Sequence, residues 1–459
     1  MYEAVFQILR VGKSLELITE SFRLLNELDK HFPRMHLVDK EASESSQLGV
    51  VEEVLSFAFI QAWSPLRFNL NIASSVRGAS GRSISGPLDS LGFYQLIQEL
   101  AEVANEGNLQ ALEIKSLRNM LLFQYLVNAL EGDFILHNRV YEETMNWTHL
   151  RESLLNMLLS TRRINYKGLM KDCLSIMCGL FEVSARISED LESPDNSAAK
   201  LSHNGNTAAA FALLEFGNNA CIALQKLLKI IMELDMSRKK ADMQGSTTRA
   251  DAVRTPLVEI ILDELTYNTD MLSPFLKIFN EPKWKLEIIL LYFSKYTTKS
   301  STRTRRSSGP TEDATTFIGV LNCFCNVTST RSITKKISPD VVQVLLAHAF
   351  QKDVKKIKKI CRNAQGICSS VIVHVVDELI PKSQCYKAHL SSSSQQDADG
   401  TSASKDEERS SSVVEICEKI ISAFSNLRRT NAKVEILPFG KEALFTAAAI
   451  LSTKTGAHV

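Results

Sequence analysis

Three successive helix starts within residues 254–296 constrain this chain more than any other feature. Thr-Pro at 255–256 and Ser-Pro at 273–274 place a hydroxyl before a proline, and Pro282 opens a third candidate helix. A hydroxyl can cap free amides there, and proline is tolerated in a first turn because its missing N–H would have no partner. Apolar residues follow at helical spacing: Leu257, Ile260, Ile261, Leu265, Trp284, Ile288, Leu291 and Tyr292. We therefore expect short antiparallel helices that form a scaffold.

The composition is that of a globular protein with ample material for a core. Of 459 residues, 44% are hydrophobic and 23% are charged, and the net charge is +1, so overall charge predicts no attraction to nucleic acid or anionic membranes. No stretch approaches the roughly 20 apolar residues of a membrane span, and the N-terminus lacks the apolar run of a secretory signal. We expect an intracellular protein without a membrane partner, built as two or three domains or one helical array.

The apolar pattern is helical almost throughout, without a strict repeat of fixed period. It predicts an all-α fold, an armadillo- or HEAT-like solenoid of antiparallel helix pairs. The predicted parts are an N-terminal helical part at 1–192 with a disordered loop near 64–90, a central helical part at 207–296, a basic linker at 297–314, a helical part at 315–360, an atypical insertion and Ser-rich disordered segment at 361–412, and C-terminal helices at 413–459.

Two helices can be predicted in more detail. The first carries one apolar stripe, which ends before Pro33 and could pack on the next helix or form a coiled-coil seam with a partner. The stripe consists of Ile8, Val11, Leu15, Ile18, Phe22 and Leu25. Residues 109–130 are apolar nearly all round, which predicts a central, fully covered helix that stops at Gly132.

A search for catalytic chemistry finds no convincing motif. Gly12-Lys13-Ser14 matches the end of a phosphate-binding loop, but that motif needs a glycine at position 7, which is occupied by Gln7. The sequence also contains no G-x-S-x-G or H-E-x-x-H motif. Nine cysteines at irregular spacing are typical of buried thiols in a reducing compartment, and Cys323 and Cys325 would point to different faces of one helix. The set Cys361, Cys368, Cys385 and His389 fits no common zinc module. We expect no enzyme activity, no cofactor and no metal.

Basic clusters are the remaining candidate site. Arg303, Arg305 and Arg306 are followed by Lys335 and Lys336. Such clusters serve as nuclear-import signals or as phosphate contacts on nucleic acid, and they also occur as charged, solvated linkers. Interleaved aromatic residues are missing, so the pattern does not predict single-strand binding by base stacking.

Several long phrases resemble one plant family, the negative regulators of systemic acquired resistance. The phrases are VYEETMNW at 140–147, GLMKDCLS at 168–175, IIMELDMSRKKADMQG at 230–245, VRTPLVEIILDELTY at 253–267, PKWKLEIILLY at 282–292, ITKKISPDVVQVL at 333–345 and VEILPFGKEALFTA at 434–447. They are collinear and cover most of the chain. Two departures stand out: the chain begins within its first helix without the family's usual leader, and residues 351–389 have no recognised counterpart.

The resemblance implies a nuclear, non-catalytic protein that represses defence genes. It also implies a subunit of the Smc five–six chromosome-maintenance complex, similar to the Nse six subunit, with a role in homologous recombination and the DNA-damage response. Its partners would be protein subunits of that complex and chromatin, with indirect DNA contact and no small-molecule substrate. The alternative is a transcriptional repressor that binds DNA directly through the basic clusters, Arg303, Arg305, Arg306, Lys335 and Lys336.

Overall fold

The computed structural model is mainly helical and has no named strand among the residues it describes, which confirms the predicted all-α fold. The described residues are 1–31, 64–68, 86–105, 114–161, 164–192, 204–248, 251, 254–297, 316–363, 404–430 and 434–455. Within them the one strand-like feature is a parallel bridge between Leu66 and Leu88, which ties together the two ends of the predicted 64–90 loop. None of the helices in these ranges could span a bilayer. The solenoid arrangement stays a prediction.

The chain divides into two compact units, Met1–Phe279 and Asn280–Val459. The division falls inside the stretch with three helix starts, so that its first two helices belong to one unit and its third to the other. Each unit has its own set of fully buried large side chains, for example Phe123 in the first and Phe324 in the second. The two units are therefore described separately.

The N-terminal stripe forms two helices, α1 (Tyr2–Val11) and α2 (Leu15–His31), so the prediction of one continuous helix is wrong. Gly12 leaves the helix with φ −57° and ψ 152°, and its amide still donates to the Ile8 carbonyl at 2.8 Å. A Cβ at Gly12 would lie 2.5 Å from that same oxygen, so the chain can turn there only with glycine. The two helices pack on each other.

Helix α5 (Ile114–Thr144) is the central, covered helix that the sequence predicts, and α4 (Ser90–Asn105) packs beside it. The predicted stop at Gly132 is wrong, because α5 continues for three more turns. It ends where Met145 takes a left-handed φ of 56°, a conformation uncommon for a residue other than glycine. The surroundings of Gly132 are open, so nothing there forces the helix to end.

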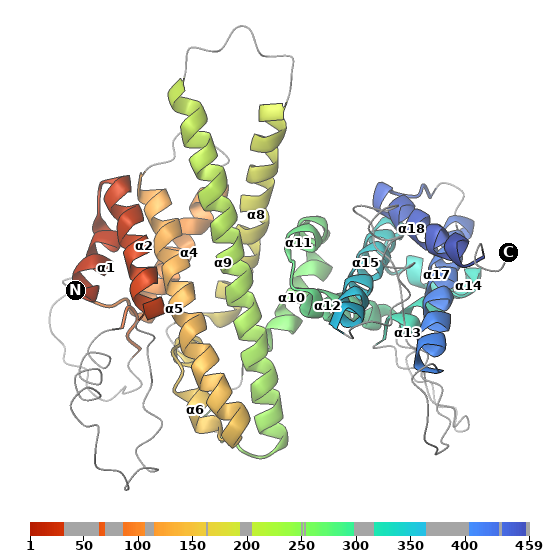
Figure 1. Ribbon diagram of the computed structural model, residues 1–459, viewed down its shortest axis with the longest axis horizontal. Coiled ribbons are helices and arrows are strands. Elements are labelled where there is room, and N and C mark those ends of the chain that lie inside the picture. Colours follow the sequence, from red (N-terminus) through yellow and green to blue (C-terminus); the bar gives the residue numbers. More distant parts are fainter. Residues whose placement is uncertain are drawn as a thin grey trace. The chain divides into compact units, whose positions relative to one another are not determined.

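Long helices complete the first unit. Their bounds are α6 (Trp147–Arg151), α7 (Leu154–Ser160), α8 (Tyr166–Glu192), α9 (Asn204–Met243), α10 (Leu257–Tyr267), the 3-10 helix η3 (Thr269–Met271) and α11 (Leu272–Ile278). Helix α9 runs between α5 and α8 and packs on both (Figure 1). Cys221 on α9 and Cys173 on α8 are buried, as expected of apolar thiols.

Of the three helix starts predicted within residues 254–296, one agrees with the structure and two differ from it. Helix α12 (Pro282–Thr297) begins at its proline, as predicted. Helix α10 begins at Leu257 without a side-chain cap from Thr255, and α11 begins at Leu272, before the Ser-Pro pair at 273–274. The reason at α10 is long-range: the Asp235 carboxylate, on α9, accepts the hydrogen bond from the Leu257 amide.

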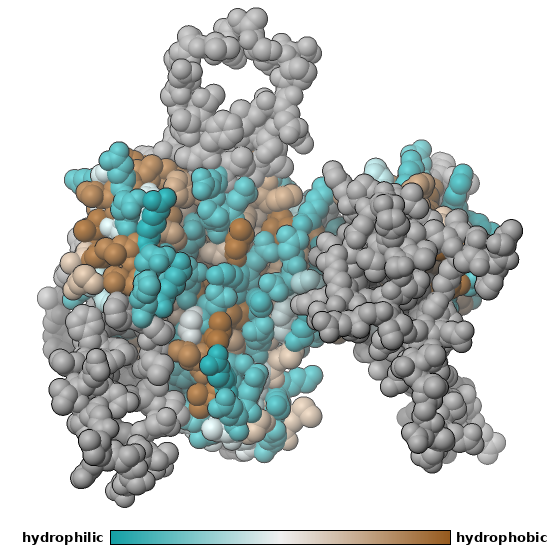
Figure 2. Space-filling view, viewed as in Figure 1, coloured by the Kyte–Doolittle hydropathy of each residue, from teal (hydrophilic) through white to brown (hydrophobic). Residues whose placement is uncertain are grey.

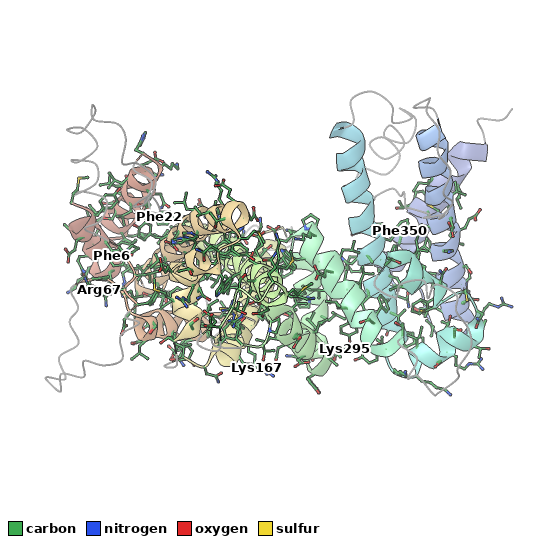
Figure 3. All side chains as sticks on the ribbon, turned by 90° about the horizontal axis from the view of Figure 1, so that it is seen from below. Phe6, Phe22, Arg67, Lys167, Lys295 and Phe350 are labelled. Atoms are coloured by element: carbon green, nitrogen blue, oxygen red, sulfur yellow. The ribbon has the colours of Figure 1, made fainter. Side chains whose placement is uncertain are left out.

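The second unit contains α12, α13 (Phe317–Asn322), α14 (Val327–Thr334), α15 (Pro339–Asn363), α17 (Ser404–Thr430) and α18 (Pro438–Thr455). A Ser-Pro pair opens α15, where the Ser338 hydroxyl accepts from the Val341 amide at 3.3 Å. Helix α17 begins at Ser404, inside the segment expected to be Ser-rich and irregular. Phe350 on α15 is fully buried in this unit (Figure 3).

Candidate interaction surfaces

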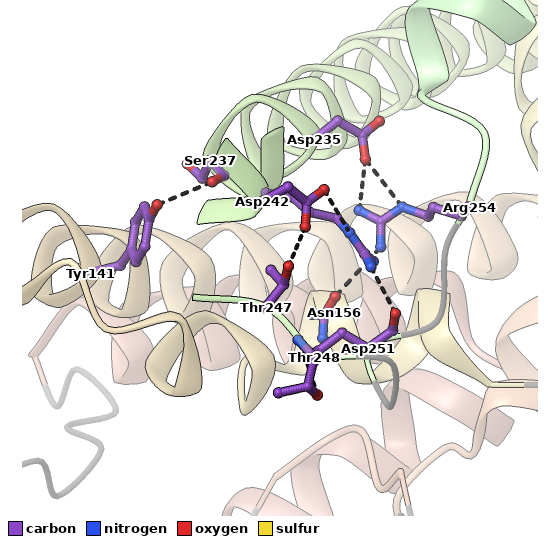
Figure 4. Close-up of polar contacts among 10 residues, drawn as sticks. Tyr141, Asn156, Asp235, Ser237, Asp242, Thr247, Thr248, Asp251 and Arg254 are labelled. Atoms are coloured by element: carbon purple, nitrogen blue, oxygen red, sulfur yellow. Dashed lines mark hydrogen bonds and ion pairs between the residues drawn. The ribbon is translucent and has the colours of Figure 1, made fainter. Parts of the chain in front are cut away.

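A buried ion pair holds the start of α10 against α9. The Arg254 guanidinium donates to Asp235 Oδ1 from Nε at 3.1 Å and from a terminal nitrogen at 2.8 Å, and its other nitrogen reaches Asn156 at 3.4 Å (Figure 4). The side chains of Arg254 and Asp235 are only 8% and 11% exposed. Burial raises the pKa of Asp235, and the Arg254 charge opposes that rise. Asp235 therefore joins two helices and caps one of them.

The turn after α9 is closed by a second carboxylate. Asp251 Oδ2 accepts from the Thr248 amide at 2.8 Å and from its hydroxyl at 3.0 Å, while Arg238 donates to the Asp251 carbonyl at 2.9 Å. Burial alone would raise the pKa of Asp251, but the hydrogen bonds from Thr248 and Trp147 and the charge of Arg151 together outweigh it, so the pKa is lowered. These contacts fix the path from α9 to α10, so they position helices.

The described cysteines are poorly suited to nucleophilic or metal chemistry in the core. Burial raises the pKa of the Cys173, Cys178 and Cys221 thiols to about 12, so they remain protonated at neutral pH. Cys323 and the exposed Cys325 lie in the turn between α13 and α14, so their predicted place on one helix is wrong. The described residues contain no group of three or more His, Cys, Asp or Glu that could hold a metal ion.

The zinc set considered from the sequence, Cys361, Cys368, Cys385 and His389, lies outside the residues whose side chains are described. The same holds for Arg303, Arg305 and Arg306 of the basic linker. The roles predicted for these residues stay predictions.

Lys335 and Lys336 are described, and both are exposed at the C-terminal end of α14. The Lys336 ammonium donates to the Tyr296 carbonyl at 3.2 Å, which places it at the C-terminal end of α12. Lys295 lies in the last turn of α12 (Figure 3). The fold thus brings together cations at the C-terminal ends of α12 and α14. Residue 297, at the end of α12, is the last described residue before the basic linker.

Arg331 is a further exposed cation that the sequence reading missed. It lies one turn before Lys335 on α14, and the Lys335 amide bonds to its carbonyl at 3.2 Å. The signal was present as an i, i+4 spacing, which places both side chains on one helix face. It was missed because the sequence does not show that one helix runs from residue 331 to its C-cap at residue 335.

An apolar surface lies on the N-terminal helices. Four aliphatic side chains of α1 and α2 are exposed by 39% to 60%, namely Ile8, Val11, Leu17 and Leu24. We call these four residues the N-terminal apolar face. Figure 2 shows brown, apolar side chains gathered over this part of the first unit. Exposed apolar patches of this kind often mark sites where proteins bind.

Comparison with known families matches both halves of the chain. The model of the SNI1 middle domain matches residues 34–281, and the model of the SNI1 C-terminal domain matches residues 297–381 and 359–455. The chain belongs to the SNI1 family. The limit between the two family domains agrees with the limit between the two compact units, at Phe279 and Asn280.

One curated relative extends the match to nearly the whole chain. It is "Negative regulator of systemic acquired resistance SNI1" of Arabidopsis thaliana, 42% identical over 455 residues, which are 99% of this chain and 84% of that protein. No solved structure matches. The C-terminal family domain matches in two stretches that overlap at 359–381, within the segment 351–389 for which no counterpart was recognised.

Proposed function

We propose that this protein is a negative regulator of systemic acquired resistance that acts as a non-catalytic scaffold. The observation that carries the proposal is the 42% identity to the Arabidopsis regulator across 99% of the chain. At that similarity the whole fold is shared, so a shared role is the simplest inference. The buried polar groups fit this role, because those around Arg254 and Asp251 join helices to one another.

The finer proposal is a nuclear subunit of the Smc five–six complex that contributes to homologous recombination and the DNA-damage response. Support comes from the resemblance of the long sequence phrases. A helical scaffold binds partners through exposed apolar anchors on its helix faces, surrounded by polar residues. The N-terminal apolar face offers such anchors on a hairpin whose other side is packed in the core, where Phe6 and Leu25 are fully buried.

The test is purification of the tagged protein from plant nuclei, with nuclease treatment to remove bridging DNA. Retention of Smc-type subunits after nuclease supports the scaffold. If nuclease released every associated protein, the scaffold would be wrong, and the repressor that binds DNA directly would take its place.

A pair of variants sharpens this test. Leu17→Ser with Leu24→Ser removes two anchors of the N-terminal apolar face, which are 60% and 44% exposed. Ile135→Ser with Ile222→Ser is the matched control, because these side chains are 48% and 53% exposed on α5 and α9. Substitutions at exposed positions change stability little. Loss of partners in the first variant alone would assign them to this face, whereas retention by both would exclude it.

A further inference from the structure

Three exposed cations lie at the C-terminal end of α14. Arg331 and Lys335 are exposed one helical turn apart, and Lys336 follows with its ammonium on the Tyr296 carbonyl. We call Arg331, Lys335 and Lys336 the α14 basic face. Cations at a helix C-terminus commonly complement the helix dipole, and that accounts for Lys336 at the end of α12. Arg331 lies in the last turn of α14, where the dipole of that helix likewise favours a cation.

The face is not neutralised by neighbours in the chain. From residue 316 to residue 338, which spans α13 and α14, the sequence contains no Asp or Glu. The next acidic residue is Asp340, in the first turn of α15. Thr328 and Ser332 are exposed on α14 and add hydroxyl donors beside the cations. The exposed charges of α14 itself are therefore all basic, although the whole chain is nearly neutral, and on the neighbouring helix α17 Glu415 is paired with Lys419 at 2.7 Å.

The apolar surroundings decide which partner fits this face. A protein interface needs a desolvated apolar centre. Among the described residues of the second unit, the exposed large apolar side chain is Phe445, which lies on α18. Helices α12 to α15 expose no such anchor and no aromatic ring for base stacking in their described side chains. Charge without an apolar anchor favours a phosphate backbone, and the missing stacking surface favours a duplex over a single strand.

We propose that the α14 basic face binds the phosphate backbone of duplex nucleic acid without reading its sequence. The inference goes beyond the proposed function, in which chromatin is reached through partner proteins. Arg331 and Lys335 lie about one helical pitch apart, roughly 6 Å. Phosphates of one strand recur about every 3.4 Å along the duplex axis, so this separation covers about two steps and the two side chains can contact separate phosphates of one strand.

The experiment is fluorescence anisotropy of a labelled 20-base-pair DNA duplex with the full chain, from 50 to 200 mM NaCl. We expect binding that weakens steeply with salt. Arg331→Glu with Lys335→Glu should weaken binding by at least about tenfold and reduce the slope of log affinity against log salt by about 2, since each lost contact removes about 0.9. Arg331→Lys with Lys335→Arg keeps both charges and should restore binding.

Lys240→Glu with Lys441→Glu is the matched control, because it changes the net charge equally at exposed positions on α9 and α18. It should bind within about threefold of the parent chain. Circular dichroism melting of each variant checks that the fold is kept.

Four results would overturn the proposal: no binding at 50 mM NaCl, an unchanged affinity in the Arg331/Lys335 variant, an equal loss in the control, or polyglutamate competing better than duplex. The last result would assign the face to an acidic protein. The anisotropy experiment contains neither partner proteins nor chromatin. If the chain does not bind the duplex, the co-purification test of the proposed scaffold function is therefore unaffected.

Discussion

Among the most buried polar contacts between distant helices, charged groups are prominent in the first unit and neutral side-chain amides in the second. In the first unit, charged groups make the long-range contacts: Arg254 pairs with Asp235, and the Asp133 carboxylate accepts from the Leu154 amide at 2.7 Å. In the second unit, a buried side-chain amide makes contacts of this kind, while the cations Lys336 and Lys419 join helices at less buried positions. Gln343, fully buried, donates to the Glu435 carbonyl at 2.9 Å and accepts from the Leu437 amide at 2.9 Å.

This difference predicts different weaknesses. A buried ion pair is costly to break because the remaining charge has no counter-charge in a poorly solvated place. A neutral amide leaves only unsatisfied hydrogen-bonding groups, so its loss costs less and depends little on pH. The stability of the first unit should therefore be sensitive to loss of a charge and to low pH. The stability of the second unit should depend mainly on side-chain shape and hydrogen-bond geometry.

The largest effect is expected from Arg254→Ala. It leaves Asp235 buried without its partner, and the free energy of unfolding of the first unit should fall by about 3–5 kcal/mol. Hydrogen exchange on the intact chain measures this as lost protection in α9 and α10, with protection in α15 and α18 kept. A loss below about 1 kcal/mol would contradict the role given to this pair.

Gln343→Ala should have the next largest effect, now in the second unit. It strands the Glu435 carbonyl and the Leu437 amide, and we expect a loss of about 2–3 kcal/mol in protection of α18. Gln244→Ala is the control at an exposed position. If Gln343→Ala destabilised α9 and α10 as strongly as α18, the contrast between the units would fail.

The contribution of Asp251 to stability should depend on pH, unlike that of the neutral amide contacts. The pKa of Asp251 in the folded chain lies below the ordinary value of 3.8, so the carboxylate adds stability above pH 3.8 that is lost as the pH falls through its folded pKa. Asp251→Asn should therefore lower stability by about 1 kcal/mol at pH 7, and the difference from the parent should shrink below pH 3.8. Urea unfolding at pH 7 and pH 3 checks this. A constant difference would exclude the charge as its cause.

Gly132→Ala should give the smallest effect and the opposite sign. Gly132 lies inside α5, where an added Cβ would meet nothing within 4 Å. Alanine should stabilise this helix by about 0.5–1 kcal/mol because it restricts the unfolded chain. Thermal unfolding measures the gain. Destabilisation would indicate that the helix needs glycine there, as the sequence reading supposed.

Local patterns in the sequence predicted what depends on local structure. The apolar surround of α5 and the start of α12 at Pro282 were both predicted from spacing and residue type. The break at Gly12 was missed because the apolar stripe continues across it. The cap of α10 was misassigned to Thr255 because its acceptor, Asp235, lies 22 residues earlier on another helix.

The basic site was predicted only in part for a similar reason. Lys335 and Lys336 were recognised as adjacent charges, but their meeting with the end of α12 depends on tertiary packing. Arg331 needed knowledge of where α14 begins and ends. Ile8 and Val11 of the N-terminal apolar face belong to the stripe that could form a seam with a partner, whereas Leu17 and Leu24 were missed because their exposure depends on the packing of α2.

The most direct test of the account is complementation in Arabidopsis plants that lack the SNI1 relative. Defence-gene transcripts are measured without infection, in plants expressing this chain and in plants expressing the Arg254→Ala variant. The account predicts that the chain restores low transcript levels and that the destabilised variant does so less well. Full-length, nuclear protein at normal abundance that left transcripts high would contradict the proposed negative regulation.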